Sequence, residues 1–345
     1  MKSPEINIGI LGAGGYGRTA RSNIRNAGGF KIVVCMDTNE ETARAAAAEE
    51  NAEAVATLEE LLAFPGLAAV SINTPIPLHA EQSLQCLEAG KHVLITKPVA
   101  RSVSEALAVA DAASRKKLAY MVGHHARHEP SIMEIKKRLE SGALGRVCNV
   151  LVTCCSGSGL VQSPGDWRAE PGRNPGGPLL HCGIHLLDVL RSFYGEVKAV
   201  SAIMQEEITS YEAVDNTLTL LDFENGVQAA VVCNYTTAYM HTLDIFGTEG
   251  NLHHHQHITD LGQEELYLQG RKAGPHEPWE RIEPSGSNAV NQHGGVLERE
   301  FARQIHTQAY EYENLHDATA ALRIVEAAVE SHKSGKKVRI SPSRV

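Results

Sequence analysis

The chain has 345 residues, of which 43% are hydrophobic and 21% are charged, and its formal net charge is −9 at pH 7. A chain of this length and ordinary composition predicts two globular domains and gives no reason to expect disorder. The acidic balance argues against nucleic acid and against an anionic membrane surface as partners, because both attract basic protein faces.

The sequence shows neither a targeting pattern nor a pattern of paired cysteines. The sequence has no run of 18 apolar residues and no amino-terminal signal pattern, so we expect neither a membrane span nor secretion. Its seven cysteines are odd in number and form no CxxC pair. Reduced thiols in a cytoplasmic protein fit this pattern best.

Residues 1–123 alternate between strand-like and helix-like segments. The expected strands are 6–11, 30–36, 68–73, 92–96 and 119–122, and the expected helices are 16–27, 40–51, one from Thr57, 79–89 and one capped by Ser102 or Ser104. Strict alternation predicts a doubly wound parallel sheet with right-handed crossovers.

Residues 124–345 have a different pattern. The expected elements are a helix at 130–141, a strand at 146–153, a long polar loop at 156–178, an apolar helix at 179–194, strands at 197–206, 214–223, 226–236 and 240–247, and helices at 296–308 and 316–334. Consecutive strands predict an open, mainly antiparallel sheet and therefore an α+β domain. Packing of the last helix and strand back onto the first domain stays open.

A glycine-rich turn follows the first expected strand. Gly12, Gly14 and Gly17 match GxGxxG and open a helix, and Gly15 and Tyr16 lie within the same turn. Such a turn lets a pyrophosphate approach the backbone, and the helix N-terminus offers it free N–H groups. The sequence therefore predicts a dinucleotide site, against the alternative of an ordinary tight turn.

Two further strand ends are expected to line this dinucleotide. Asp37, followed by Thr38, ends the second strand; its carboxylate can accept hydrogen bonds from the ribose hydroxyls and would repel a 2′-phosphate, which favours NAD over NADP. Asn73, Thr74 and Pro75 end the third strand, where ligands of parallel sheets bind. The alternatives are a surface aspartate and a capped turn.

A lysine ends the fourth expected strand. Lys97 precedes Pro98, which biases the lysine towards an extended backbone at the edge that carries the glycine turn. An ammonium beside a reacting hydroxyl can stabilise a developing alkoxide or relay its proton. The alternative is a solvated surface lysine.

A polar stripe marks the apolar helix expected at 179–194. His181, His185 and Asp188 are spaced i, i+4 and i+7, so they share one helical face. A histidine can take a hydroxyl proton as hydride leaves the same carbon. Each histidine could instead be a core residue bonded to a carbonyl. As a less favoured alternative, the pair could bind a metal, with a third ligand such as His255 or His257.

Taken together, these motifs resemble the Gfo/Idh/MocA family of glucose-fructose oxidoreductase-like and inositol dehydrogenase-like proteins. The resemblance rests on the segments 12–17, 73–75, 89–93, 96–98, 123–127, 167–168, 176–177 and 183–185. It implies a Rossmann domain, followed by a domain whose open sheet often forms a homo-oligomer interface, so we expect a homodimer or homotetramer.

The resemblance also assigns roles to residues. The family's lysine falls on Lys97, with Thr96 in place of the usual glutamate, and its catalytic histidine falls on His185. An aspartate common in sugar and inositol dehydrogenases is replaced by His181. By the same analogy, we expect Trp167 and Arg168 near the nicotinamide or substrate, His79 near the cofactor entrance and His125 among the substrate-binding residues.

The main functional hypothesis is NAD-dependent hydride transfer to or from a hydroxyl carbon of a sugar, cyclitol or glycoside. Lys97 would polarise the oxygen, His185 would act as acid or base, and His181 would orient the substrate or share the proton. Two alternatives remain: an NAD-recycling enzyme that cleaves a glycoside, and a non-catalytic NAD-binding regulator.

Overall fold

The computed structural model describes residues 4–163, 165–257, 263–271, 279–284 and 295–341. Its contacts divide the chain into two compact units. The first comprises Met1–His125 and Asn291–Thr319, and the second comprises Ala126–Val290 and Ala320–Val345. No helix in the described part of the chain combines the length and the apolar character needed to cross a membrane.

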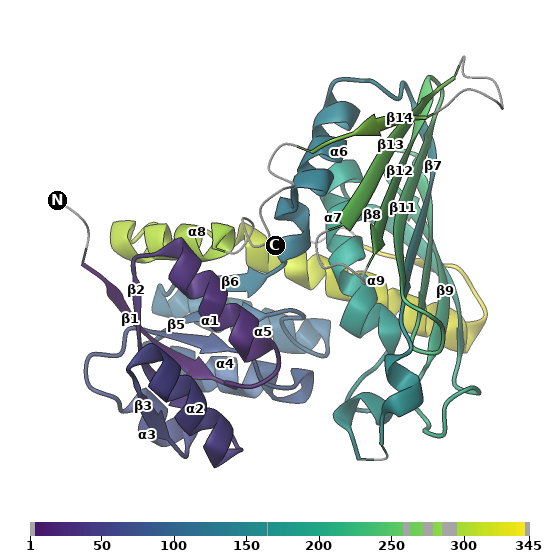
Figure 1. Cartoon of the computed structure of the whole chain (residues 1–345). Coiled ribbons are helices and arrows are strands. Elements are labelled where there is room, and N and C mark those ends of the chain that lie inside the picture. The colour runs from purple at the N-terminus through teal and green to yellow at the C-terminus, as the bar shows by residue number, and fades with distance from the viewer. Residues whose placement is uncertain (1–3, 164, 258–262, 272–278, 285–294, 342–345) are drawn as a thin grey trace. The chain divides into compact units, whose positions relative to one another are not determined.

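The first unit contains a six-stranded parallel sheet with the order β3-β2-β1-β4-β5-β6, which confirms the predicted doubly wound fold (Figure 1). Its strands are β1 Ile6–Leu11, β2 Phe30–Met36, β3 Glu53–Val55, β4 Ala69–Ile72, β5 His92–Thr96 and β6 Tyr120–Gly123. Its helices are α1 Tyr16–Ala27, α2 Glu40–Glu50, α3 Leu58–Leu62, α4 His79–Glu88, α5 Val103–Lys116 and α8 Val296–Thr307, with a 3₁₀ turn at Ile76–Leu78.

Helix α8 belongs to this first unit although it follows most of the second unit in the chain. Phe301 is fully buried and stacks on Phe30 with ring centroids 6.1 Å apart. The Tyr312 hydroxyl donates to the carbonyl of Ala113 at 3.0 Å, and Asn314 Oδ1 accepts from the backbone of Val122 at 2.6 Å. Apolar burial and these bonds explain why residues 295–319 group with the parallel sheet.

The second unit contains a nine-stranded sheet with the order β14-β13-β12-β11-β7-β10-β9-β8-β15. Its strands are β7 Val147–Cys155, β8 Val197–Gln205, β9 Asn216–Phe223, β10 Gln228–Asn234, β11 Met240–Gly247, β12 Gly250–His257, β13 Gln263–Gly270, β14 Glu280–Ile282 and β15 Val338–Arg339. Its helices are α6 Pro130–Glu140, a π-helix at Leu179–Gly183, α7 Ile184–Tyr194 and most of α9 Glu313–Ser334, with 3₁₀ turns at His125–His128, Ser158–Val161 and Trp167–Ala169. Among the strands that the structure describes in this sheet, only β7 and β10 pair in parallel, so the predicted mainly antiparallel sheet is confirmed.

Three features of the sequence prediction needed correction, and the place of the last strand, which the sequence leaves open, is observed. The short edge strand β3 was missed, as were β12 to β14, and the helix expected from residue 179 begins with a π-helical turn. The last strand, β15, pairs with β8 in the second sheet and not with the first unit. Strand β3 has no buried residue, and β12 carries histidines on both faces, so neither shows the alternation on which strand prediction relies.

Helices cover one face of the second sheet, and the opposite face is exposed. Figure 1 shows the long strands β7 to β13 side by side, with helices α6 and α7 against one face. Leu151, Leu220 and Ala230 lie across three neighbouring strands in one row on the opposite face. Leu220 is 59% exposed and Ile203 on β8 is 63% exposed, so this open face carries large apolar side chains.

Candidate functional site

The glycine turn between β1 and α1 is closely packed on one side and open on the other. A Cβ on Gly17 would lie 2.1 Å from the carbonyl oxygen of Gly12, and one on Gly12 would lie 2.8 Å from the Asn73 backbone. Gly15 has φ +46°, and a Cβ there would meet nothing within 4 Å. The turn therefore needs glycines for its own packing, while its free side leaves space for a ligand.

The Asp37 carboxylate lies directly over this turn. Its Oδ2 accepts hydrogen bonds from the amides of Ala13 at 2.9 Å and Gly14 at 3.1 Å, and its Oδ1 accepts one from Asn39 at 3.0 Å. Thr38 beside it is exposed. The carboxylate is thus fixed at the end of β2, where the sequence predicts ribose recognition.

Sequence reasoning missed a buried arginine that supports the turn from beneath. Arg21 on α1 is 4% exposed, and its Nη1 donates to the Ala13 carbonyl at 2.6 Å. Its Nη2 and Nε also pair with Glu49 at 2.6 Å and Glu50 at 3.2 Å on α2. An arginine inside an amphipathic helix carries no motif, so only the coordinates reveal its role.

His79 connects the loops that follow β4 and β5. Its ring nitrogens lie 2.7 Å from the Thr74 carbonyl and 2.6 Å from the Pro98 carbonyl, and its side chain is fully buried. Burial lowers the pKa of His79, although the two carbonyl contacts oppose this shift. From its buried position, His79 therefore contacts the backbone of both segments, one of which carries Pro75 and the other Lys97.

A second cluster in the first unit joins a predicted cofactor residue to a predicted substrate residue. His125 Nδ1 lies 3.3 Å from the Tyr16 hydroxyl, and His125 Nε2 lies 3.1 Å from Glu298 Oε1 on α8. The structure thus brings Tyr16 and His125 together. Glu298 was not foreseen, because 173 residues separate it from His125.

In the second unit, three predicted residues lie side by side. His181 sits in the π-helix, a feature often found at functional sites. Its ring packs edge-on against Trp167, with centroids 5.7 Å apart, and against Tyr235 at 5.9 Å. The Arg168 guanidinium lies 4.4 Å from the centre of the Trp167 ring. His181 therefore has aromatic neighbours on two sides.

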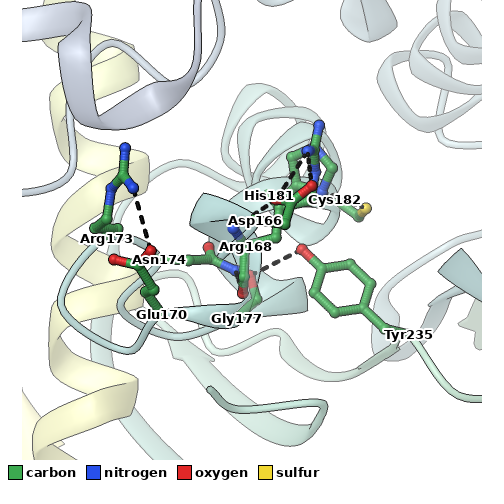
Figure 2. A network of polar contacts seen from close by, with 9 residues as sticks. All are labelled: Asp166, Arg168, Glu170, Arg173, Asn174, Gly177, His181, Cys182 and Tyr235. Carbon is green, nitrogen blue, oxygen red and sulfur yellow. Dashed lines mark hydrogen bonds and ion pairs between the residues drawn. The ribbon is translucent and has the colours of Figure 1, made fainter. Parts of the chain in front are cut away.

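The loop before the π-helix is held by its own polar contacts (Figure 2). Arg168 Nη1 pairs with Asp166 at 3.2 Å, and Asn174 Nδ2 donates to the Arg168 carbonyl at 3.1 Å. The Tyr235 hydroxyl donates to the Gly177 carbonyl at 3.4 Å. These bonds fix Trp167 and Arg168 relative to His181.

The thiol of Cys182 contacts His181, and the thiol of Cys154 contacts Cys182; neither was foreseen as part of a site. Cys182 Sγ is 3.5 Å from His181 Nδ1, and Cys154 Sγ on β7 is 3.1 Å from His241 Nε2 on β11. Hydrogen bonding to Cys154, together with burial, raises the pKa of Cys182 to about 12, while His181 opposes the shift. Cys182 is therefore a thiol at neutral pH.

Two residues of the predicted polar stripe, His185 and Asp188, lie on α7 in different surroundings. His185 is half-buried in the first turn of the helix. Asp188 is buried and forms an ion pair with Arg127. Among the described residues, no group of three or more histidine, cysteine, aspartate or glutamate side chains is arranged to hold a metal ion. The side chain of His257 lies outside the described residues.

Two family models match this chain. The model described as oxidoreductase family, NAD-binding Rossmann fold, matches residues 6–124. The model described as GFO/IDH/MocA C-terminal domain matches residues 132–253. Together they span most of the chain. The chain belongs to the GFO/IDH/MocA oxidoreductase family. The predicted family, the oxidoreductase class and the NAD-binding Rossmann domain are therefore confirmed.

Individual relatives are more distant. The chain is 27% identical over 270 residues to the scyllo-inositol 2-dehydrogenase (NAD(+)) of Bacillus subtilis, covering 74% of this chain and 77% of that one. It is 30% identical over 216 residues to the levoglucosan dehydrogenase of Pseudarthrobacter phenanthrenivorans, covering 54% and 55%. A putative NADPH-dependent oxidoreductase structure from Desulfitobacterium hafniense superposes with a TM-score of 0.89 at 24% identity over 98% of both chains, which shows a shared fold.

Proposed function

We propose that this family member transfers a hydride between C4 of the nicotinamide of NAD and a hydroxyl carbon of a sugar, cyclitol or glycoside. The observation that carries the proposal is the match of both family models to a chain that keeps Lys97 at the carboxyl end of β5. Relatives named as dehydrogenases of an inositol and of levoglucosan support a polyhydroxylated substrate.

The described residues fit a nicotinamide dinucleotide. The open side of the turn at Gly15 leaves room for a pyrophosphate, and the N-terminus of α1 supplies amides. The fixed carboxylate of Asp37 favours NAD, because a 2′-phosphate would meet its negative charge. When bound, the nicotinamide supplies the hydride acceptor or donor, and Gly12, Gly14, Gly17, Thr38, Asn73, Thr74 and Pro75 would line the rest of the dinucleotide.

We assign the proton chemistry to Lys97 and His185. The Lys97 ammonium would stabilise the developing alkoxide, and the His185 imidazole would take or return the hydroxyl proton. His181 would orient the substrate, helped by Trp167 and Arg168. The division of labour follows the two units: the first unit would hold the cofactor, and the second unit would hold the substrate.

The open face of the second sheet suits a second copy of the chain. A hollow there is lined by Leu151, Leu220, Ala230 and Phe246, among others. Exposed apolar surface of this kind commonly mediates association. We therefore propose a homodimer or homotetramer; Leu220→Asp should release monomers in light scattering, whereas Leu107→Asp on α5 should not. A wild-type monomer would contradict it. The seven free thiols support a cytoplasmic location.

A substrate screen tests the proposed function. Wild-type protein is incubated with NAD and a panel of sugars, inositols and aryl glycosides, and both nicotinamide absorbance and product mass are recorded. We expect NADH and a product two mass units lighter than the polyol. Lys97→Ala should remove turnover, while the surface variant Lys116→Ala should keep it. Aglycone release without NADH would instead indicate an NAD-recycling glycoside-cleaving enzyme, and NAD binding without turnover a regulator.

A further inference from the structure

Glu298 is a buried carboxylate that the proposed chemistry does not use. It lies in the first turn of α8 and is 1% exposed. Burying a carboxylate without a partner costs several kcal/mol, so a native protein keeps one only where compensating contacts exist. Its neighbours therefore indicate what the carboxylate does.

The contacts of Glu298 keep it ionised. Burial alone would raise the pKa of Glu298, but the hydrogen bond and charge of His125 and the backbone amides at the start of α8 lower it by more. An ionised carboxylate can only accept hydrogen bonds. The proton between the two groups therefore sits on His125 Nε2, 3.1 Å from Glu298 Oε1.

This assignment directs the other ring nitrogen towards the glycine turn. His125 Nδ1 lies 3.3 Å from the Tyr16 hydroxyl and 3.1 Å from the Gly123 carbonyl. Burial and the charge of Glu298 raise the pKa of Tyr16, so its hydroxyl keeps its proton. Tyr16 immediately follows Gly15, where the backbone leaves open space. With the ring proton on Nε2, Nδ1 accepts from the Tyr16 hydroxyl, and this bond holds the tyrosine ring next to the glycine turn.

We propose that Glu298 is a positioning residue for the glycine turn that would hold the dinucleotide diphosphate, acting through His125 on the Tyr16 side chain. The inference rests on the proposed function. A turn whose neighbouring side chain is already ordered loses less conformational freedom when the dinucleotide binds, so the chain of three side chains increases affinity for the cofactor. All three lie in the first unit, and α8 therefore serves the cofactor site.

The test measures NADH affinity by fluorescence titration without any substrate. Glu298→Gln keeps the shape and removes the charge, and we expect about tenfold weaker binding, the scale of one charge-assisted hydrogen bond. Glu300→Gln is the matched control, because it lies on the same helix and pairs with Arg303 away from this cluster. In steady-state assays, the KM for the cofactor should rise while kcat changes little.

A double-variant cycle separates this role from a structural one. If Glu298 acts through Tyr16, Tyr16→Phe should weaken NADH binding by a similar factor, and the double variant should bind about as well as either single variant. Wild-type NADH affinity in Tyr16→Phe would overturn the inference, and this result can be obtained even if Glu298→Gln does not fold. A loss of affinity in the double variant equal to the product of the two single losses would also overturn it. Wild-type protein that binds no NADH would overturn the proposed function itself.

Discussion

The guanidinium of Arg127 and the carboxylate of Asp188 form a two-pronged ion pair. Arg127 Nε donates to Asp188 Oδ2 at 2.8 Å, and Nη2 contacts the other oxygen. Asp188 is only 1% exposed. The third member of the stripe predicted on the 179–194 helix therefore ties α7 to the segment after β6, while His181 and His185 are the members assigned to substrate chemistry.

Arg127→Met should reduce the free energy of unfolding by about 3 kcal/mol, because it removes the guanidinium that pairs with the buried Asp188 carboxylate. Urea denaturation at pH 7 measures the loss. The double variant Arg127→Met, Asp188→Leu should recover part of it. Arg173→Met, which breaks an exposed pair with Glu170, should cost less than about 1 kcal/mol. An equal cost for both single variants would contradict the assignment.

Arg21→Met should weaken NADH binding by roughly tenfold, because the Ala13 carbonyl would lose the donor that holds the glycine turn. The variant should also lose stability, since the mostly buried Glu50 would lose one of its two arginine partners. Titration of NADH at a temperature where the variant is fully folded separates the two effects. Arg44→Met, on the exposed surface of α2, is the control. Unchanged affinity in Arg21→Met would rule out support of the turn.

His92 should make stability depend on pH. Burial lowers its pKa to about 4, and its Nδ1 accepts a hydrogen bond from the Ala119 amide at 2.9 Å. The folded state thus holds neutral histidine, whereas the unfolded chain takes up a proton below about pH 6.5, so stability falls as pH drops from 6.5 towards 4. Allowing for partial solvent exposure, about 1 kcal/mol should be lost between pH 7 and pH 5.

The variant His92→Asn isolates this contribution, because its amide oxygen can still accept from Ala119 but does not titrate. Urea midpoints at pH 7 and pH 5 should differ less for the variant than for the wild type. An identical pH dependence in the two proteins would show that His92 is not the group responsible.

Much of the fold could be predicted because local signals agreed with it. Thr57 and Glu60, three residues apart, form a capping box at the start of α3, the helix expected from Thr57. Asn225 and Gly226, a residue pair typical of hairpin turns, connect β9 to β10. The glycine turn precedes its helix as expected, since these features depend on neighbours in the sequence.

Long-range contacts account for what the sequence could not show. Arg21 donates to the Ala13 carbonyl and also pairs with glutamates on α2. Glu298 contacts His125 from a helix that follows the second sheet in the chain. The π-helical turn around His181 has no compositional signature. Cys154 and Cys182 approach each other only because β7 packs near that turn. Each depends on tertiary packing, which periodicity does not reveal.

His181→Ala should lower kcat/KM for the polyol by about a hundredfold and leave NADH affinity unchanged, because the ring lies with Trp167 and Tyr235 in the proposed substrate unit. His316→Ala on α9 provides a histidine control. A weaker NADH affinity with normal substrate kinetics would show that His181 acts in cofactor binding and not in substrate binding.

The most direct test of the account follows the hydrogen itself. A polyol that turns over in the screen is prepared with deuterium on the carbon that is oxidised, and the NADH formed is analysed by mass spectrometry. Direct hydride transfer predicts that the deuterium appears at C4 of the nicotinamide, with a slower rate than for the unlabelled polyol. NADH without deuterium, or the label recovered in water, would contradict the proposed reaction.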